Sequence, residues 1–162
     1  MAERPSAARQ CFGCGDANPR GLGLEFRNED GRAVADVSAE RHLQGYPGRA
    51  HGGVVATILD EAMSWAAYWS GSWTATARMT MRFRRPVPIE QELHASGWLV
   101  RDRGRFMELR AELRTTDGVL LAEAEGVFAR VSEAEGREMQ RYEASETGRQ
   151  TDTITSLQDG RP

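Results

Sequence analysis

The longest regular pattern in the chain has the period of an α-helix. Between His51 and Ser70, apolar side chains recur at every third or fourth position and form one continuous face. The members of this face are Val54, Val55, Ile58, Leu59, Ala62, Met63, Trp65, Ala66 and Trp69. The spacing predicts a helix that buries this face, and Gly71 is expected to cap its C-terminus.

After this helix the period changes to two, which is typical of strands with one buried face. The expected strands cover residues 76–84, 92–99, 107–114 and 119–131. The connections Asp102–Gly104 and Thr116–Gly118 have the length and the glycines of hairpin turns, so the sheet is predicted to be antiparallel. In the first of these strands, the alternation assigns Ala77, Met79, Met81 and Phe83 to the buried face.

Two shorter strands are expected before the helix, over residues 22–27 and 33–37, with an Asp-Gly turn between them. The chain is therefore predicted to be an α+β protein, in which one long helix fills the concave side of one curved antiparallel sheet. Residues 21–132 form the expected domain.

Both ends of the chain differ in composition from this domain. Residues 1–20 are polar and rich in glycine, proline and arginine, and are interpreted as a lead-in that carries a C-x-x-C loop. Residues 133–162 contain few apolar side chains, so a short polar helix near residues 133–142 and then a disordered tail are expected.

The composition excludes several classes of function. All 21 basic residues are arginines, so chemistry that depends on a lysine is excluded. The net charge of −3 argues against a nucleic-acid-binding protein. Because no apolar run of about 18 residues and no signal-peptide pattern is visible, no membrane association is expected. With only two cysteines, a cytoplasmic, reducing location is the expectation.

The most informative short motif is His51-Gly52-Gly53, at the predicted start of the helix. The first turn of a helix has unpaired N–H groups and carries the positive end of the helix dipole. Glycines there allow a ligand to approach the backbone closely. The motif is therefore a candidate oxyanion site, although glycines that only relieve a tight turn fit the sequence as well.

Asp60 is the second candidate, because it falls on the helix face opposite the apolar one, among small residues. It follows His51 by nine residues, which corresponds to about 13 Å of helix rise and two and a half turns. The two side chains then point to opposite sides, so a site that uses both must combine two subunits. Glu61 is a candidate substrate contact, but a solvent-exposed side chain is the favoured interpretation there.

Other catalytic arrangements lack support in the sequence. No Gly-x-Ser-x-Gly motif is present, neither cysteine lies near a predicted helix start, and no Ser/His/Asp triad can be assigned, so acyl transfer would have to use a carboxylate. Cys11 and Cys14 form a single C-x-x-C pair, and a structural zinc site needs four ligands. No metal site is therefore assigned. A structural loop is favoured over a zinc or redox function for the pair.

Residues 51–61 resemble the H-G-G-x(6)-D motif of hotdog-fold acyl-CoA thioesterases of the PaaI-like branch. Thr76, which stands ten residues before Pro86, resembles the start of the strand that follows the helix in that family. The segment around Cys11 and Cys14 is similar to one that is common in a subgroup. The resemblance extends over about residues 11–131 and implies a hotdog fold, a homodimer or a dimer of dimers, acyl-CoA as substrate and no cofactor.

The same resemblance implies roles for individual residues. The N–H of Gly52 polarises the thioester carbonyl, with His51 and Gly53 in support. Asp60 of the partner chain is nucleophile or general base, and Thr76 orients the water. Many relatives have an Asn six residues before the histidine, where this chain has Gly45, so Gln44 is a candidate replacement. This departure supports an alternative, a module that binds acyl-CoA without hydrolysing it.

A dehydratase on the same fold and a zinc or redox module are less favoured alternatives. The arginines acquire a possible role as a clamp for the phosphates of CoA, because planar guanidinium groups bind phosphate in a bidentate manner. The candidates for this clamp are Arg49, Arg84, Arg85 and Arg103. The acyl group is not specified, because Met63, Trp65, Trp69 and Trp73 fit a core as well as a pocket.

Overall fold

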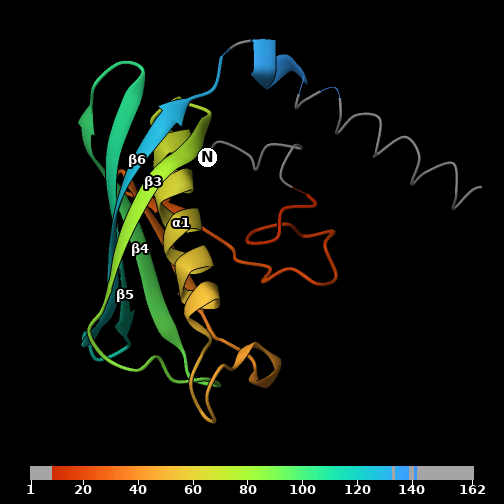
Figure 1. Cartoon of the computed structure of the whole chain (residues 1–162), viewed down its shortest axis with the longest axis vertical. Helices are drawn as coiled ribbons and strands as arrows, with labels where there is room; N and C mark the ends of the chain where they lie inside the picture. Colours follow the sequence, from red (N-terminus) through yellow and green to blue (C-terminus); the bar gives the residue numbers. More distant parts are fainter. Residues whose placement is uncertain (1–8, 133, 139–140, 142–162) are drawn as a thin grey trace, which may run out of the picture.

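A computed structural model describes residues 9–132, 134–138 and 141 of the chain. One helix, α1 (Gly52–Trp69), lies along one face of a six-stranded antiparallel sheet (Figure 1). The strands, in the order β1-β2-β4-β5-β6-β3 across the sheet, are β1 (Arg27–Glu29), β2 (Arg32–Val37), β4 (Leu93–Asp102), β5 (Phe106–Thr115), β6 (Leu120–Arg130) and β3 (Thr74–Phe83). A short 3₁₀ helix, η2 (Arg41–Leu43), precedes the loop that leads into α1.

The helix and the sheet share one hydrophobic core. The predicted apolar face of α1 is buried, and Leu59 and Met63 are fully enclosed between helix and sheet. Two glycines allow this close packing. A Cβ on Gly97 of β4 would overlap the backbone carbonyl of Ala62, and one on Gly126 of β6 would press on the Met63 sulfur. The depth at which α1 lies on the sheet is therefore set by residues without side chains.

The aromatic residues near the C-terminal end of α1 belong to this core. Trp65 is buried and packs against Phe26 at 6.4 Å and Trp69 at 5.0 Å between ring centroids. Tyr68 extends the cluster to Trp73. Within the chain, these side chains pack against one another, which favours a core role over an acyl pocket.

The expected helix and the four strands that follow it are confirmed to within three residues at each end. The prediction for residues 22–27 is wrong, because only Arg27–Glu29 pairs with the sheet. The backbone N–H groups of Leu22 and Leu24 donate instead to the carbonyls of Phe12 and Gly13, at 2.8 and 2.9 Å. These residues therefore close the lead-in loop.

A β-bulge changes which side chains of β3 face the helix. The β3–β6 register shifts between Thr76 and Arg78, so one extra residue, Ala77, enters β3. Thr76 is then paired with buried Phe128, while Ala77 is exposed, contrary to the simple alternation. The bulge thus presents a threonine hydroxyl to α1 where the sequence pattern expected an alanine.

At the C-terminal side, residues 134–138 are helical, within the expected range 133–142. Ser132 and Glu135 form a reciprocal capping pair at its start, with the Ser132 N–H donating to Glu135 Oε2 at 2.9 Å. The expectation of disorder after this helix concerns residues 142–162, which lie outside the described residues. In the described part of the chain, no helix combines the length and the apolar character needed to cross a bilayer.

The close approach at Gly97 gives a testable consequence. Gly97→Ala is expected to lower the free energy of unfolding by about 1–3 kcal/mol, because α1 must move away from β4 to admit the methyl group. Urea unfolding at one fixed protein concentration measures it. Gly136→Ala is the matched control, since a Cβ there meets no atom within 4 Å and stability should not fall. Equal stability of the two variants would contradict this view of the packing.

Candidate active site

The first turn of α1 leaves one backbone donor free. His51 is the N-cap in an extended conformation (φ −63°, ψ 140°), and its Nδ1 accepts from the Gly53 N–H at 3.0 Å. The carbonyl of His51 accepts from Val54 and Val55 at 2.9 and 3.2 Å. Among the described residues, the Gly52 N–H has no acceptor, and Gly52 is exposed. The structure thus distinguishes the two glycines, since only Gly52 presents a free donor at the positive end of the helix.

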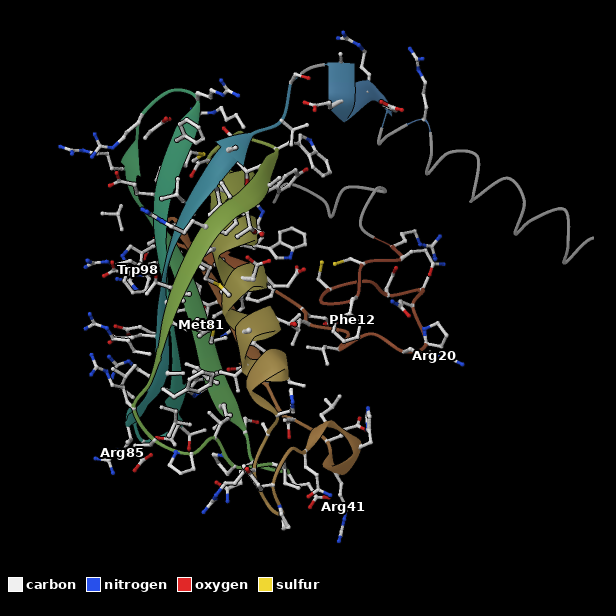
Figure 2. All side chains as sticks on the ribbon, in the orientation of Figure 1. Phe12, Arg20, Arg41, Met81, Arg85 and Trp98 are labelled. Carbon is white, nitrogen blue, oxygen red and sulfur yellow. The ribbon has the colours of Figure 1, made fainter. Side chains whose placement is uncertain are left out.

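Gly52 opens onto a groove of about 570 Å³ that also contains Arg49, Arg84 and Arg85. Figure 2 shows Arg85 at the end of the sheet where α1 begins. Arg84 is engaged by Glu123, at 2.9 Å from Nε to Oε1, whereas Arg49 and Arg85 form no ion pair with any described residue. The other lining residues are Tyr46, Ala50, Val55, Phe83, Pro86 and Val87.

Arg103, the fourth candidate for the phosphate clamp, lies elsewhere. It belongs to the β4–β5 hairpin and pairs with Glu108 at 2.5 Å. Conversely, the groove contains two residues that the sequence reading did not assign to a site, Tyr46 and Phe83, whose side chains are 83% and 55% exposed. Exposed aromatic side chains beside a free N–H donor indicate a binding site. This signal is visible only in the fold, because the alternation of β3 assigned Phe83 to the buried face.

Asp60 lies on the side of α1 that faces β3. The Thr76 hydroxyl donates to Asp60 Oδ1 at 2.7 Å, which the bulge in β3 makes possible. Burial raises the pKa of Asp60, and this effect is opposed by the hydrogen bond from Thr76. Two predicted site residues are therefore brought together, and the carboxylate is half-buried and held in one orientation.

The favoured expectation for Glu61, a solvent-exposed side chain, is wrong. The lead-in loop covers it, and a 3.1 Å hydrogen bond joins Glu61 Oε1 to Cys11 Sγ. Gly13 lies so close that a Cβ there would stand 2.6 Å from the Glu61 Oε1. Burial raises the pKa of Glu61 to about 8, and Cys11 and Asp60 add to the effect. A substrate contact for Glu61 would have to displace this loop.

The loop that carries Gln44 and Gly45 supports the start of α1. Gln44 Oε1 accepts from the Gly48 N–H at 3.3 Å, so its side chain stabilises the turn before the helix. Gly45 packs directly on His51, because a Cβ would meet the His51 Cα and ring at 3.3 Å. A side chain at position 45 would therefore press on the N-cap residue, which gives a physical reason for the glycine.

Within one chain, the candidate residues form two separate half-sites. One half-site consists of the Gly52 N–H and the groove with its arginines; the other consists of Asp60 and Thr76. Since eight residues of helix separate Asp60 from Gly52, the carboxylate lies about 12 Å along the axis from the free donor. The two groups cannot act on the same atom of one small ligand within a single chain.

Comparison with known proteins gives a consistent picture. The sequence model of a family described as "Thioesterase superfamily" matches residues 47–122. A protein of Bos taurus named "Acyl-coenzyme A thioesterase THEM4" is 33% identical over 116 residues, which are 68% of this chain and 48% of the relative. The chain thus spans about half the length of the curated relatives that it matches.

Two solved structures show the same fold. Protein RHA08564, described as a thioesterase superfamily protein, superposes with a TM-score of 0.72 at 30% identity, over 80% of this chain and 71% of that chain. The Escherichia coli PaaI protein from the phenylacetic acid degradation operon has a TM-score of 0.64 at 20% identity, over 68% of this chain and 81% of its own. The architecture of one helix on one antiparallel sheet is shared with both.

Proposed function

This chain belongs to the thioesterase superfamily and has its hotdog fold, and we propose that it hydrolyses acyl-CoA thioesters to the free acid and CoA. The observation that carries the proposal is the free N–H of Gly52, which opens onto a groove with three arginines. The name of the bovine relative supports acyl-CoA as the substrate class.

The Gly52 N–H is suited to bind the thioester carbonyl oxygen. Attack on the carbonyl carbon turns this oxygen into an oxyanion, and a fixed donor at a helix N-terminus stabilises the developing charge. His51 positions this donor, because its ring accepts the Gly53 N–H and keeps the first turn of α1 formed. Donor and dipole are in place before substrate binds, so the chemical step requires no reorganisation there.

Asp60 supplies the second chemical group. As general base, its carboxylate takes a proton from the water that attacks the carbonyl carbon; the C–S bond then breaks and CoA leaves as a thiolate. As nucleophile, it attacks the carbonyl carbon and expels CoA as the thiolate, and water then hydrolyses the resulting acyl anhydride to the free acid and the regenerated Asp60 carboxylate. In both routes, the hydrogen bond from Thr76 fixes the carboxylate orientation and leaves Asp60 Oδ2 for the reacting atoms.

The complete site is proposed to form between two copies of the chain. Among the described residues, β3 pairs only with β6, so the other edge of this ten-residue strand carries unpaired backbone groups. Both half-sites border this strand: Thr76 near one end holds Asp60, and Phe83 at the other end lies beside Gly52. Antiparallel pairing of two β3 strands would bring the Thr76 end of one next to the Phe83 end of the other, and would unite the half-sites across the interface.

The first test is hydrolysis itself. Asp60→Asn is expected to reduce kcat by about 10²- to 10⁴-fold on a panel of short-chain, long-chain and aromatic acyl-CoAs, measured as release of free CoA. Asp30→Asn, in the exposed β1–β2 turn, is the matched control and should leave the rate unchanged. Tight acyl-CoA binding without thiol release by the wild-type protein would select the non-catalytic alternative instead.

The shared site can be tested by complementation. Gly52→Pro removes the N–H at the first helical position, where proline is tolerated, and His51 already has the extended backbone that precedes a proline. Gly52→Pro and Asp60→Asn homodimers should both be inactive. After refolding of a 1:1 mixture, half of the dimers are mixed and each has one intact site, so about a quarter of the wild-type rate should return.

If native mass spectrometry detects mixed dimers but no activity returns, the site does not combine Gly52 of one chain with Asp60 of the other. A monomer of full activity would exclude the shared site directly.

The arginines of the groove should act on binding of CoA rather than on chemistry. Arg49→Ala and Arg85→Ala are each expected to raise KM for acyl-CoA about tenfold with kcat little changed, because each removes a charge-assisted phosphate contact. Arg103→Ala is the control outside the groove. A thioester of pantetheine, which lacks the CoA phosphates, should be hydrolysed equally by wild type and variants. A fall in kcat alone would contradict a phosphate clamp.

A further inference from the structure

A second cluster of reactive side chains lies next to Asp60, on the flank of α1 that the lead-in loop covers. It consists of Cys11 and Cys14 from the loop and Glu61 from the helix (Figure 2 labels Phe12 of the same loop beside α1). Their two sulfurs and one carboxylate oxygen all lie within 4.8 Å of one another. Three ligand atoms of metal-binding type therefore converge from segments that are fifty residues apart in sequence.

Backbone contacts hold the loop in this geometry, in addition to the hydrogen bond from Cys11 Sγ to Glu61. The Gly15 N–H donates to the Cys11 carbonyl at 3.0 Å and closes the C-x-x-C turn. The backbone N–H groups of Leu22 and Leu24 donate to the carbonyls of Phe12 and Gly13. Cys14 is buried, with 3% of its surface exposed, and Gly13 has no side chain that could obstruct Glu61. The sulfurs are thus preorganised by the chain around them.

The chemistry of the cluster lacks a positive charge. Cys11, Cys14, Glu61 and the adjacent Asp60 are all acids, and no arginine among the described residues forms an ion pair with either carboxylate. A bound cation would satisfy the same groups in their ionised form, and thiolates favour a thiophilic ion over magnesium or calcium.

We propose that Cys11, Cys14 and Glu61 bind one Zn²⁺ ion, with three protein ligands and a fourth position left to solvent. Tetrahedral zinc accepts thiolate sulfur and carboxylate oxygen together, and three protein ligands with one open position are the arrangement of catalytic zinc sites, unlike the four-ligand structural site that the C-x-x-C pair alone cannot form. The ion would fasten the lead-in loop to α1 one residue from Asp60. This assignment does not depend on thioester hydrolysis.

The test uses the full chain, purified with reductant and freed of metal by a chelator. Titration with Co²⁺, the spectroscopic substitute for zinc, should give one ion per chain and a thiolate-to-cobalt charge-transfer band, which Zn²⁺ then removes. Cys11→Ser and Cys14→Ser should each lose most of this band. Glu61→Gln should keep it but weaken Co²⁺ binding at least about tenfold, and exposed Glu25→Gln is the matched control.

X-ray absorption at the zinc edge of the wild-type protein gives a readout that does not depend on whether a variant folds. It should show two sulfur neighbours and two lighter neighbours around the zinc. Absence of the charge-transfer band in fully reduced wild-type protein would overturn the site. It would also be overturned if a small-molecule disulfide oxidised both thiols together and the reduced protein bound no metal. Unchanged affinity in Glu61→Gln would remove the carboxylate from the ligand set.

Discussion

The packing of α1 on the sheet is the constraint on which the rest of the structure depends. Because Gly97 carries no side chain, the helix backbone lies close to β4, and because Gly126 carries none, the Met63 side chain packs directly on β6. The rotation of the helix about its own axis is fixed by the buried face around Leu59 and Met63. Once depth and rotation are fixed, every polar residue of α1 has a determined direction. The N-terminus opens to the groove, and Asp60 is directed to β3. The functional arrangement is thus a consequence of core packing.

The sequence predicts the parts of this arrangement that local physics controls. The helix can be predicted because a continuous apolar face with a period of 3.6 residues matches no other regular secondary structure. The strands can be predicted because hairpin turns separate them. Residues 22–27 have the composition of a strand, but their backbone donors are used by Phe12 and Gly13, a tertiary pairing that leaves no local signal. The bulge at Ala77 is likewise invisible in the alternation, although it decides that Thr76 meets Asp60.

The site follows the same division. His51, Gly52 and Asp60 are recognisable from one short motif, because helix geometry alone relates an N-cap to a residue two and a half turns later. The family resemblance assigns the donor role to Gly52, and the structure adds the local reason that the sequence could not supply: the His51 ring accepts the Gly53 N–H, which leaves the Gly52 N–H without an acceptor among the described residues. The contact of Glu61 with Cys11 joins residues fifty positions apart, so ligand spacing within the C-x-x-C segment could not reveal it.

Asp60 and Glu61 are neighbours in sequence, yet the helix turns them about 100° apart and directs them to different surroundings. Glu61 meets the lead-in loop, and Asp60 meets the edge strand β3. The loop covers one flank of α1 and the sheet covers another, so under the proposed function a substrate would reach Asp60 from the flank toward the open edge of β3. Among the described strands, β3 and the three-residue β1 are the two edges of the sheet, and β3 is the long one; a second copy that paired along β3 would cover Asp60 while bringing its own Gly52 toward it. Dimerisation and completion of the site are then one event, and a metal ion at Glu61 would act on it through the position of the loop.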